Sequence, residues 1–292
     1  MAFERPLHVS QNIIIPLGVL MIIFATFTFT GTPVAAIFGQ KPPLFTTSRL
    51  PEVSSPTLQL LGERGETSIT VPAWIYKGLH AAPAILWSIL MPLQHNNSFR
   101  KKYPKFHRSA GYIIITFSFI LSLSGYWFLV SKHAYSHVNR YHLHDLDGLS
   151  PIPWPTFELT LWLLAPPYYF TLYKTATTAR ARDFVQHQKW AVLHTIVSST
   201  ISLQRVTMTA SYGLGLVLML VSREQVHEFF KVQDLASAAA AELDMFALTT
   251  ATAYVMMVFW LLYQLRCAGY FRGVTNNLFS VVDQETAAKK VA

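Results

Sequence analysis

The chain has little charge and almost no cysteine. Only 13% of its 292 residues are charged, whereas soluble domains carry about 25% charged residues. The single cysteine, Cys267, excludes an internal disulfide and a cysteine-based metal site. Because 52% of the residues are hydrophobic and the mean hydropathy is +0.32, the composition predicts an integral membrane protein.

Several catalytic sequence patterns are also absent. The chain has no Gly-x-Ser-x-Gly, no His-Glu-x-x-His and no phosphate-binding glycine loop, so nucleophilic catalysis is not supported. The net charge of +8 does not indicate nucleic-acid binding, because the basic residues stand at the ends of apolar runs, as membrane topology predicts. We therefore expect the lipid bilayer as a partner and no nucleic acid.

Long apolar runs extend over most of the chain and predict an all-α membrane bundle. A spanning helix needs roughly 20 mostly apolar residues. The six expected spans are residues 13–38, 71–93, 107–130, 154–173, 187–211 and 243–265. They form a single membrane domain over residues 1–292 with a polar tail at 274–292. The first run is interpreted as a retained anchor, and Gly213 and Gly215 are expected to break the apolar run that follows the fifth span.

Charge predicts the orientation of these spans. With six spans, one side of the membrane holds 14 lysines and arginines but only four acids, and the other side holds nine cations and 11 acids. Under the positive-inside rule the basic side is cytoplasmic. Both termini and the loop around Lys101 are therefore expected in the cytoplasm.

Ionisable residues within spans are expected to gather at two depths. Each charged residue at a span centre costs about 2.5–3.5 kcal/mol on insertion scales, so such residues need partners. The outer group, which we consider for acid–base catalysis, comprises His80, Glu158, Arg205 and Asp244. Arg205 is expected to pair with Glu158 or Asp244. Histidines can also be satisfied core residues, and acids near a helix start are favoured by the helix dipole.

The inner group is expected near the cytoplasmic face. It contains His95, His107, His187 and His194, of which His107 and His187 begin their spans at the same depth. A bis-histidine b-type haem between His107 and His187 would fit this arrangement, with His194 as the alternative ligand from the fifth span. The alternative is that His107, Arg108 and Lys189 contact lipid phosphates at the membrane surface and form no binding site.

Four more histidines lie in the outer loop 131–153. They are His133, His137, His142 and His144. Together with Asp145 they could bind Zn²⁺ or Cu²⁺, but no tetrahedral ligand spacing stands out. We expect a solvated loop and no metal site there.

Four segments carry a resemblance to a known family. They read LHAAPAILWSILMPLQ, FRKKYPKFHRSAGYI, QHQKWAVLH and SLQRVT. This set resembles the membrane family called domain of unknown function 2306 over about residues 75–210. The matching positions are His80, Gln94, Arg100, His107, Arg108, Gly111, His187, Trp190 and Arg205. Ala191 departs from the pattern, where Met is common. The resemblance implies a fold far more than a function.

Three functions therefore remain open from the sequence. The sequence slightly favours a membrane redox protein that holds haem b and receives electrons from a donor. The second is a cofactor-free acid–base enzyme, a cyclase or isomerase, acting on a lipophilic small molecule. The third is a non-enzymatic transporter or structural protein, although no inverted repeat supports a transporter.

Overall fold

The structure is a computed structural model that describes residues 12–24, 73–131, 139–145, 148, 150–222, 224–225, 228 and 235–267. This part of the chain is mostly helical, which confirms the predicted all-α class. A short antiparallel ribbon, β1 (Leu143–His144) paired with β2 (Trp154–Pro155), is its only sheet. The polar tail 274–292 and His133 and His137 lie outside the described residues.

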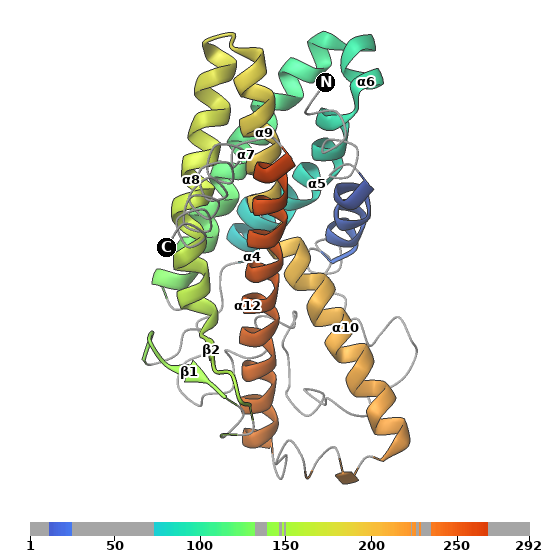
Figure 1. Ribbon diagram of the computed structural model, residues 1–292, viewed down its shortest axis with the longest axis vertical. Coiled ribbons are helices and arrows are strands. Elements are labelled where there is room, and N and C mark those ends of the chain that lie inside the picture. Colours follow the sequence, from blue (N-terminus) through green and yellow to red (C-terminus); the bar gives the residue numbers. More distant parts are fainter. Residues whose placement is uncertain are drawn as a thin grey trace, which may run out of the picture.

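The helices lie roughly along one long axis (Figure 1). In chain order they are Asn12–Phe24, α4 (Ala73–Ile75), the π-helical turn η2 (Tyr76–Ala81), α5 (Ala82–His95), α6 (Asn97–Lys102), α7 (Pro104–Val130), α8 (Phe157–Arg180), α9 (Phe184–Ser198), α10 (Thr200–Val221) and α12 (Leu235–Cys267). The turns around α6 and between α8 and α9 lie at one end, and the β1–β2 ribbon lies at the other. We call these ends the basic end and the ribbon end.

Short polar caps decide where the helices of the α8–α9 hairpin begin. The Thr156 side chain accepts a hydrogen bond from Leu159 N at 3.2 Å, and Asp183 accepts one from Gln186 N at 3.1 Å. Such caps satisfy amide groups that have no partner within the helix. Between the two helices Arg182 takes the left-handed conformation, with φ of 60°. The resulting tight turn brings α9 back alongside α8.

Two helices in the described part are long and apolar enough to cross a membrane. They are Pro104–Val130 and Leu243–Arg266. These match the predicted spans 107–130 and 243–265 within a few residues. Residues 25–38 of the first expected span and residues 71–72 of the second lie outside the described residues. The described parts of the remaining expected spans form shorter, broken or more polar helices, so the six-span bundle is not confirmed.

The expected fifth span, 187–211, is divided at Ser199, and this corrects the sequence prediction. The helix does not break at Gly213 or Gly215, which both lie inside α10. Hydroxyl groups explain the position of the break. Ser199 Oγ donates to Thr195 O at 2.7 Å, and Thr200 Oγ1 donates to Val197 O at 2.7 Å. Such side-chain bonds compete with the backbone ladder and bend helices.

The core lies where α8, α9 and α12 meet. Ile196, Val197 and Ala253 are completely buried, and Met257 packs with them. The small side chain of Ala253 lets α12 approach α9 closely, as small residues do in packed membrane helices. This packing holds α9 and its histidines in fixed positions.

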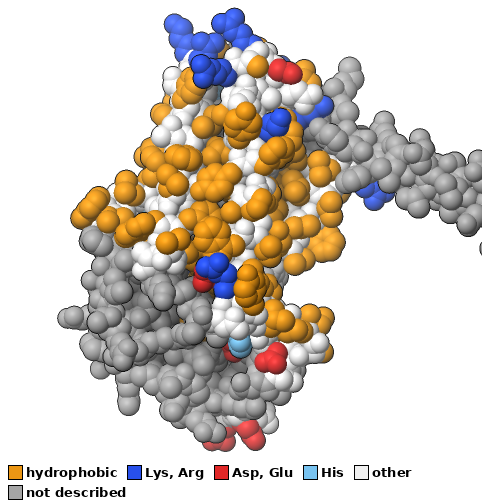
Figure 2. Space-filling view, turned by 90° about the vertical axis from the view of Figure 1, so that its left-hand side faces the viewer, with side chains coloured by type: hydrophobic (Ala, Val, Ile, Leu, Met, Phe, Trp, Pro, Cys, Tyr) orange, Lys and Arg blue, Asp and Glu red, His pale blue; other side chains and the backbone are white. Residues whose placement is uncertain are grey.

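Hydrophobic side chains are exposed along the described helices between the two ends of the bundle. In Figure 2 they form a broad belt, and Lys and Arg gather at the basic end. The belt includes Phe119, Leu163 and Phe259, which are 48%, 50% and 68% exposed. Soluble monomers rarely expose apolar patches larger than a few hundred Å². This surface and the two long apolar helices agree with the membrane protein that the composition predicts.

Helix Asn12–Phe24 packs closely on α5 at a glycine. A Cβ atom added at Gly18 would lie 3.0 Å from Ser88 O, which is closer than normal contact. Beside this point Ile14 packs with Trp87 and Met91. The absence of a side chain at Gly18 therefore sets the distance between the two helices.

We predict that Gly18→Val lowers the thermal unfolding midpoint of the purified protein. Overpacking of this kind destabilises by roughly 1–3 kcal/mol. Gly213→Val is the matched control, because nothing lies within 4 Å of a Cβ added there. Equal midpoints for the two variants would show that Gly18 is not a close helix contact.

Candidate functional site

A cavity of about 230 Å³ opens between η2, α5, α7, α8 and α10. Its walls are mostly apolar and include Met21, Trp87, Phe128, Phe157 and Phe246. These residues come from five separate helices, so only the folded bundle creates the cavity. Its lining suits a lipophilic molecule.

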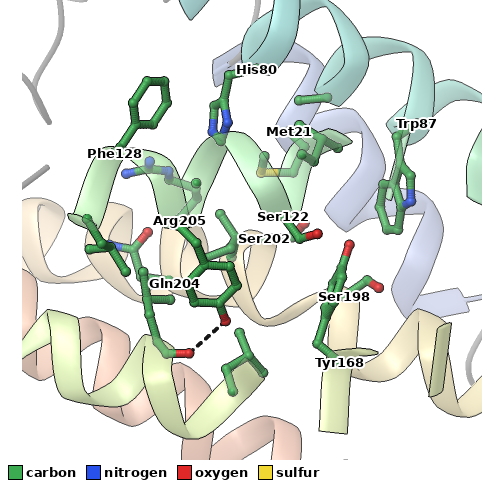
Figure 3. A pocket seen from close by; sticks show the side chains of 18 of the residues that line it. Met21, His80, Trp87, Ser122, Phe128, Tyr168, Ser198, Ser202, Gln204 and Arg205 are labelled. Carbon is green, nitrogen blue, oxygen red and sulfur yellow. Dashed lines mark hydrogen bonds between the residues drawn. The ribbon is translucent and has the colours of Figure 1, made fainter. Parts of the chain in front are cut away.

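Two of the predicted catalytic residues, His80 and Arg205, line this cavity together. His80 extends from η2 and Arg205 from α10, and Figure 3 shows the two side chains directed into the same space. They are close enough for the charge of Arg205 to act on the His80 imidazole. Arg205 also contacts Met208 Sδ at 3.8 Å and the Phe24 ring at 5.9 Å.

Hydrogen bonding determines which nitrogen of His80 is open. His80 Nδ1 lies 2.9 Å from Ser124 Oγ, and that hydroxyl is also within donating distance of Leu121 O, at 3.0 Å, and Leu79 O, at 3.3 Å. A carbonyl can only accept, so we assign the hydroxyl proton to a carbonyl and the Nδ1 proton to His80. The Nε2 atom then carries a lone pair, and it has no hydrogen-bond partner in the described part of the chain.

Further polar groups in the cavity belong to residues that were not among the predicted site residues. Ser202 has a hydroxyl without a hydrogen-bond partner among the described residues, and Gln204 is held by Thr249 at 3.5 Å. Tyr126 donates to Leu161 O and Tyr168 donates to Ser118 O, each at 2.8 Å. Of these residues, only Gln204 could have been predicted from the sequence, because it is a polar residue beside Arg205 in an apolar run.

Glu158 is placed by an ion pair at the ribbon end. It is 7% exposed, accepts from Arg140 Nε at 2.9 Å and accepts from Trp162 Nε1 at 3.2 Å. It is not among the described residues that line the cavity. The expected Glu158–Arg205 pair is therefore wrong, because a loop residue supplies the counter-charge.

Asp244 is also used at the ribbon end. His144 Nδ1 bonds its carboxylate, and Trp154 Nε1 donates to its backbone carbonyl at 3.2 Å. The expected Asp244–Arg205 pair is thus wrong as well. His144 is only 4% exposed, so the predicted solvated loop is corrected at this histidine. The described residues contain no cluster of three or more candidate metal ligands.

The inner histidines are brought together at the basic end. His95 lies beyond the expected span 71–93, where burial and the charges of His107, Arg100 and His187 lower its pKa from 6.5 to about 4. The charges of Arg100 and His187 also act on His107. Residues from α5, α6, α7 and α9 thus lie near enough to one another for their charges to interact.

His194 lies deeper and is enclosed by hydroxyl groups. It is 2% exposed. Its Nδ1 lies 3.1 Å from Thr171 Oγ1, and its Nε2 lies 3.3 Å from Ser118 Oγ and 3.2 Å from Ser198 Oγ. Both ring nitrogens are engaged, so this geometry does not offer an axial haem ligand. A haem b would depend on His107 and His187.

No family model, curated protein or solved structure matches the chain. The resemblance to domain of unknown function 2306 stays an expectation from the sequence.

We predict that Arg140 and Glu158 are energetically coupled. A double-mutant cycle with Arg140→Met and Glu158→Gln should give a coupling free energy of about 1 kcal/mol. The value is small because Arg140 is partly exposed and exposed ion pairs contribute little to stability. The measurement is thermal or denaturant unfolding of the purified protein. The control cycle, Arg205→Met with Glu158→Gln, should be additive, and coupling only in that control would contradict the assigned pair.

Proposed function

We propose that this chain is a multi-pass membrane enzyme that binds a lipophilic carbonyl compound in the cavity and isomerises it by acid–base chemistry. The observation that carries the proposal is that the open Nε2 atom of His80 and the Arg205 guanidinium share one mostly apolar cavity. A cyclase, which also rearranges bonds without changing the composition, would use the same groups.

The proposed reaction needs a base and a group that stabilises negative charge. His80 Nε2 would remove a proton from the carbon next to the carbonyl group, and Arg205 would donate hydrogen bonds to the oxygen on which charge develops. A guanidinium has five N–H donors, so Arg205 can bind a ligand oxygen while keeping its contacts in the protein. The imidazolium would then return the proton to another carbon. The atoms balance without a cofactor.

The surroundings support a lipophilic substrate. Apart from the polar groups named above, the walls are aromatic and aliphatic, and the cavity lies between helices whose outer faces form the hydrophobic belt. Because water is largely excluded from such a site, electrostatic interactions within it are strengthened. A hydrophobic molecule dissolved in the bilayer would reach this depth more readily than a soluble metabolite.

A haem b protein is our alternative proposal. Its support is that, among the described residues, His107 Nδ1 has no hydrogen-bond partner and His187 is bonded through Nδ1 alone, at 3.0 Å from Thr175 O. Each residue thus keeps one nitrogen that could bind iron, and the group would supply electron transfer. We place it second because the cavity combines a base with a cation, whereas the inner histidines lie beside a further cation, Arg100.

We further propose six spans with both termini and the basic end in the cytoplasm. The support is the excess of Lys and Arg at that end, which the positive-inside rule places in the cytoplasm. The ribbon end, with Tyr141 75% exposed, would then face the other side of the membrane.

Single-cysteine labelling tests the proposed topology. In a Cys267→Ser background, Tyr141→Cys should react with a membrane-impermeant maleimide in sealed, cytoplasm-enclosing vesicles or protoplasts. Lys101→Cys should react only after permeabilisation, because the membrane shields the cytoplasmic side. The reverse pattern, or labelling of both from outside, would contradict the orientation.

We predict that His80→Gln blocks turnover of a lipophilic metabolite. Loss of a general base slows a reaction by about 10²–10⁴-fold, so the substrate should accumulate. The measurement is mass spectrometry of lipid extracts from cells that naturally make the chain, with their own gene replaced by each variant. Substrate and product are isomers, so the expected result is a change in the ratio of two compounds of equal mass.

Two further variants control this experiment. Arg205→Met should change the ratio in the same direction, whereas Arg266→Met, at an exposed arginine near the end of α12, should leave it as in wild type. A ratio that never changes, or that changes equally with Arg266→Met, would contradict the proposed enzyme.

A further inference from the structure

Two buried nitrogen atoms at the basic end have no hydrogen-bond partner among the described residues. Gln94 Nε2 and His107 Nδ1 are both buried without a hydrogen bond in the described part of the chain. Buried polar groups in native structures are nearly always bonded, so each such exception calls for an explanation. An amide nitrogen can only donate, and therefore a ligand that satisfies Gln94 must supply an acceptor.

The two groups lie on neighbouring helices. A Cβ atom added at Gly111 on α7 would be 3.6 Å from Gln94 Oε1, so the end of α5 lies directly beside α7. His107 is four residues before Gly111, which is about one helical turn. Gln94 and His107 therefore border the same space between α5 and α7.

Arg100 lies on α6, the short helix that connects α5 to α7, and brings a cation near this space. Its charge acts on both His95 and His107. Among the described residues its side chain makes one hydrogen bond, from Nη2 to Asn97 Oδ1 at 3.0 Å, which leaves most of its donors available to a ligand. A guanidinium binds phosphate through two parallel hydrogen bonds, and such charge-assisted bonds are among the strongest in proteins.

The surrounding charge is also positive. Exposed cations stand around the site on α6 and α7, namely Lys101, Lys102, Lys105 and Arg108. No carboxylate is among the groups whose charge acts on His95 or His107. The described acid closest in sequence to His187 is Asp183, which is exposed and caps α9 through Gln186 N. An anion here would meet attraction from several directions.

We propose that Gln94, Arg100 and His107 form an anion-binding site for a phosphate group at the basic end, with His187 beside it. The phosphate belongs either to a phospholipid headgroup or to a soluble phosphorylated molecule, since both present the same oxygen acceptors. The site is separate from the His80–Arg205 cavity and does not rest on the function proposed for it.

The test uses the full chain in maltoside detergent, which contains no phosphate. Inorganic phosphate and dihexanoyl phosphatidic acid are titrated at constant ionic strength, and the thermal unfolding midpoint is followed. We expect a saturable rise in the midpoint with at least one probe. A response to phosphatidic acid alone identifies a lipid headgroup, and a response to inorganic phosphate identifies a soluble ligand.

Variants locate the effect. Arg100→Gln and Gln94→Leu should each weaken the apparent affinity by about tenfold or more, as loss of a charge-assisted or buried hydrogen bond does. Without ligand, Gln94→Leu should be at least as stable as wild type, because it removes an unpaired donor. Lys101→Gln, an exposed cation on the same helix as Arg100, is the matched control and should bind within about twofold of wild type.

Three results would overturn the site. They are no saturable response to either probe, wild-type affinity in both Arg100→Gln and Gln94→Leu, and an equal loss in Lys101→Gln, which would indicate a general cationic surface. A haem absorption band in the purified protein that disappears in His107→Ala would also overturn it, because iron would then occupy this histidine.

Discussion

The bundle depends on hydrogen bonds between helices, since polar groups away from water must find partners inside the protein. Ser118 is completely buried and joins four helices at one point. Its hydroxyl accepts from Trp87 Nε1 at 2.9 Å and lies 3.3 Å from His194 Nε2, and its carbonyl accepts from Tyr168 at 2.8 Å. These bonds connect α5, α7, α8 and α9. They fix the rotation of each helix about its own axis more specifically than apolar packing alone would.

The two candidate sites lie on either side of this junction. Towards the ribbon end, the cavity is lined by Trp87, Tyr168 and Ser198. Trp87 and Tyr168 also bond Ser118, and Ser198 also bonds His194. Towards the basic end, His95 Nε2 bonds Thr195 Oγ1 at 2.8 Å, one residue after His194. A rigid polar centre thus holds α9 in place, while His80 and His107 keep nitrogen atoms available for a ligand.

Several features were predictable because they depend on local sequence. The apolar run 107–130 forms most of α7, and the charge of His187 acts on His107 at the basic end, whereas a ligand shared by the two histidines stays a prediction. The expected partners of Arg205 were wrong for a different reason. Arg140 lies in a turn and His144 in the two-residue strand β1, where no helical period predicts the positions of side chains, and they bind Glu158 and Asp244.

The sequence by itself determined the helical class, the hydrophobic belt and the gathering of cations at one end, because composition and periodicity express these properties residue by residue. Tertiary structure decided that His80 and Arg205 share a cavity while His194 is enclosed by hydroxyl groups. It also decided that the helix breaks at Ser199 and not at Gly213. These outcomes depend on contacts between residues far apart in the chain, such as the bond between His194 and Ser118. A local sequence pattern does not specify which distant side chains will be in contact.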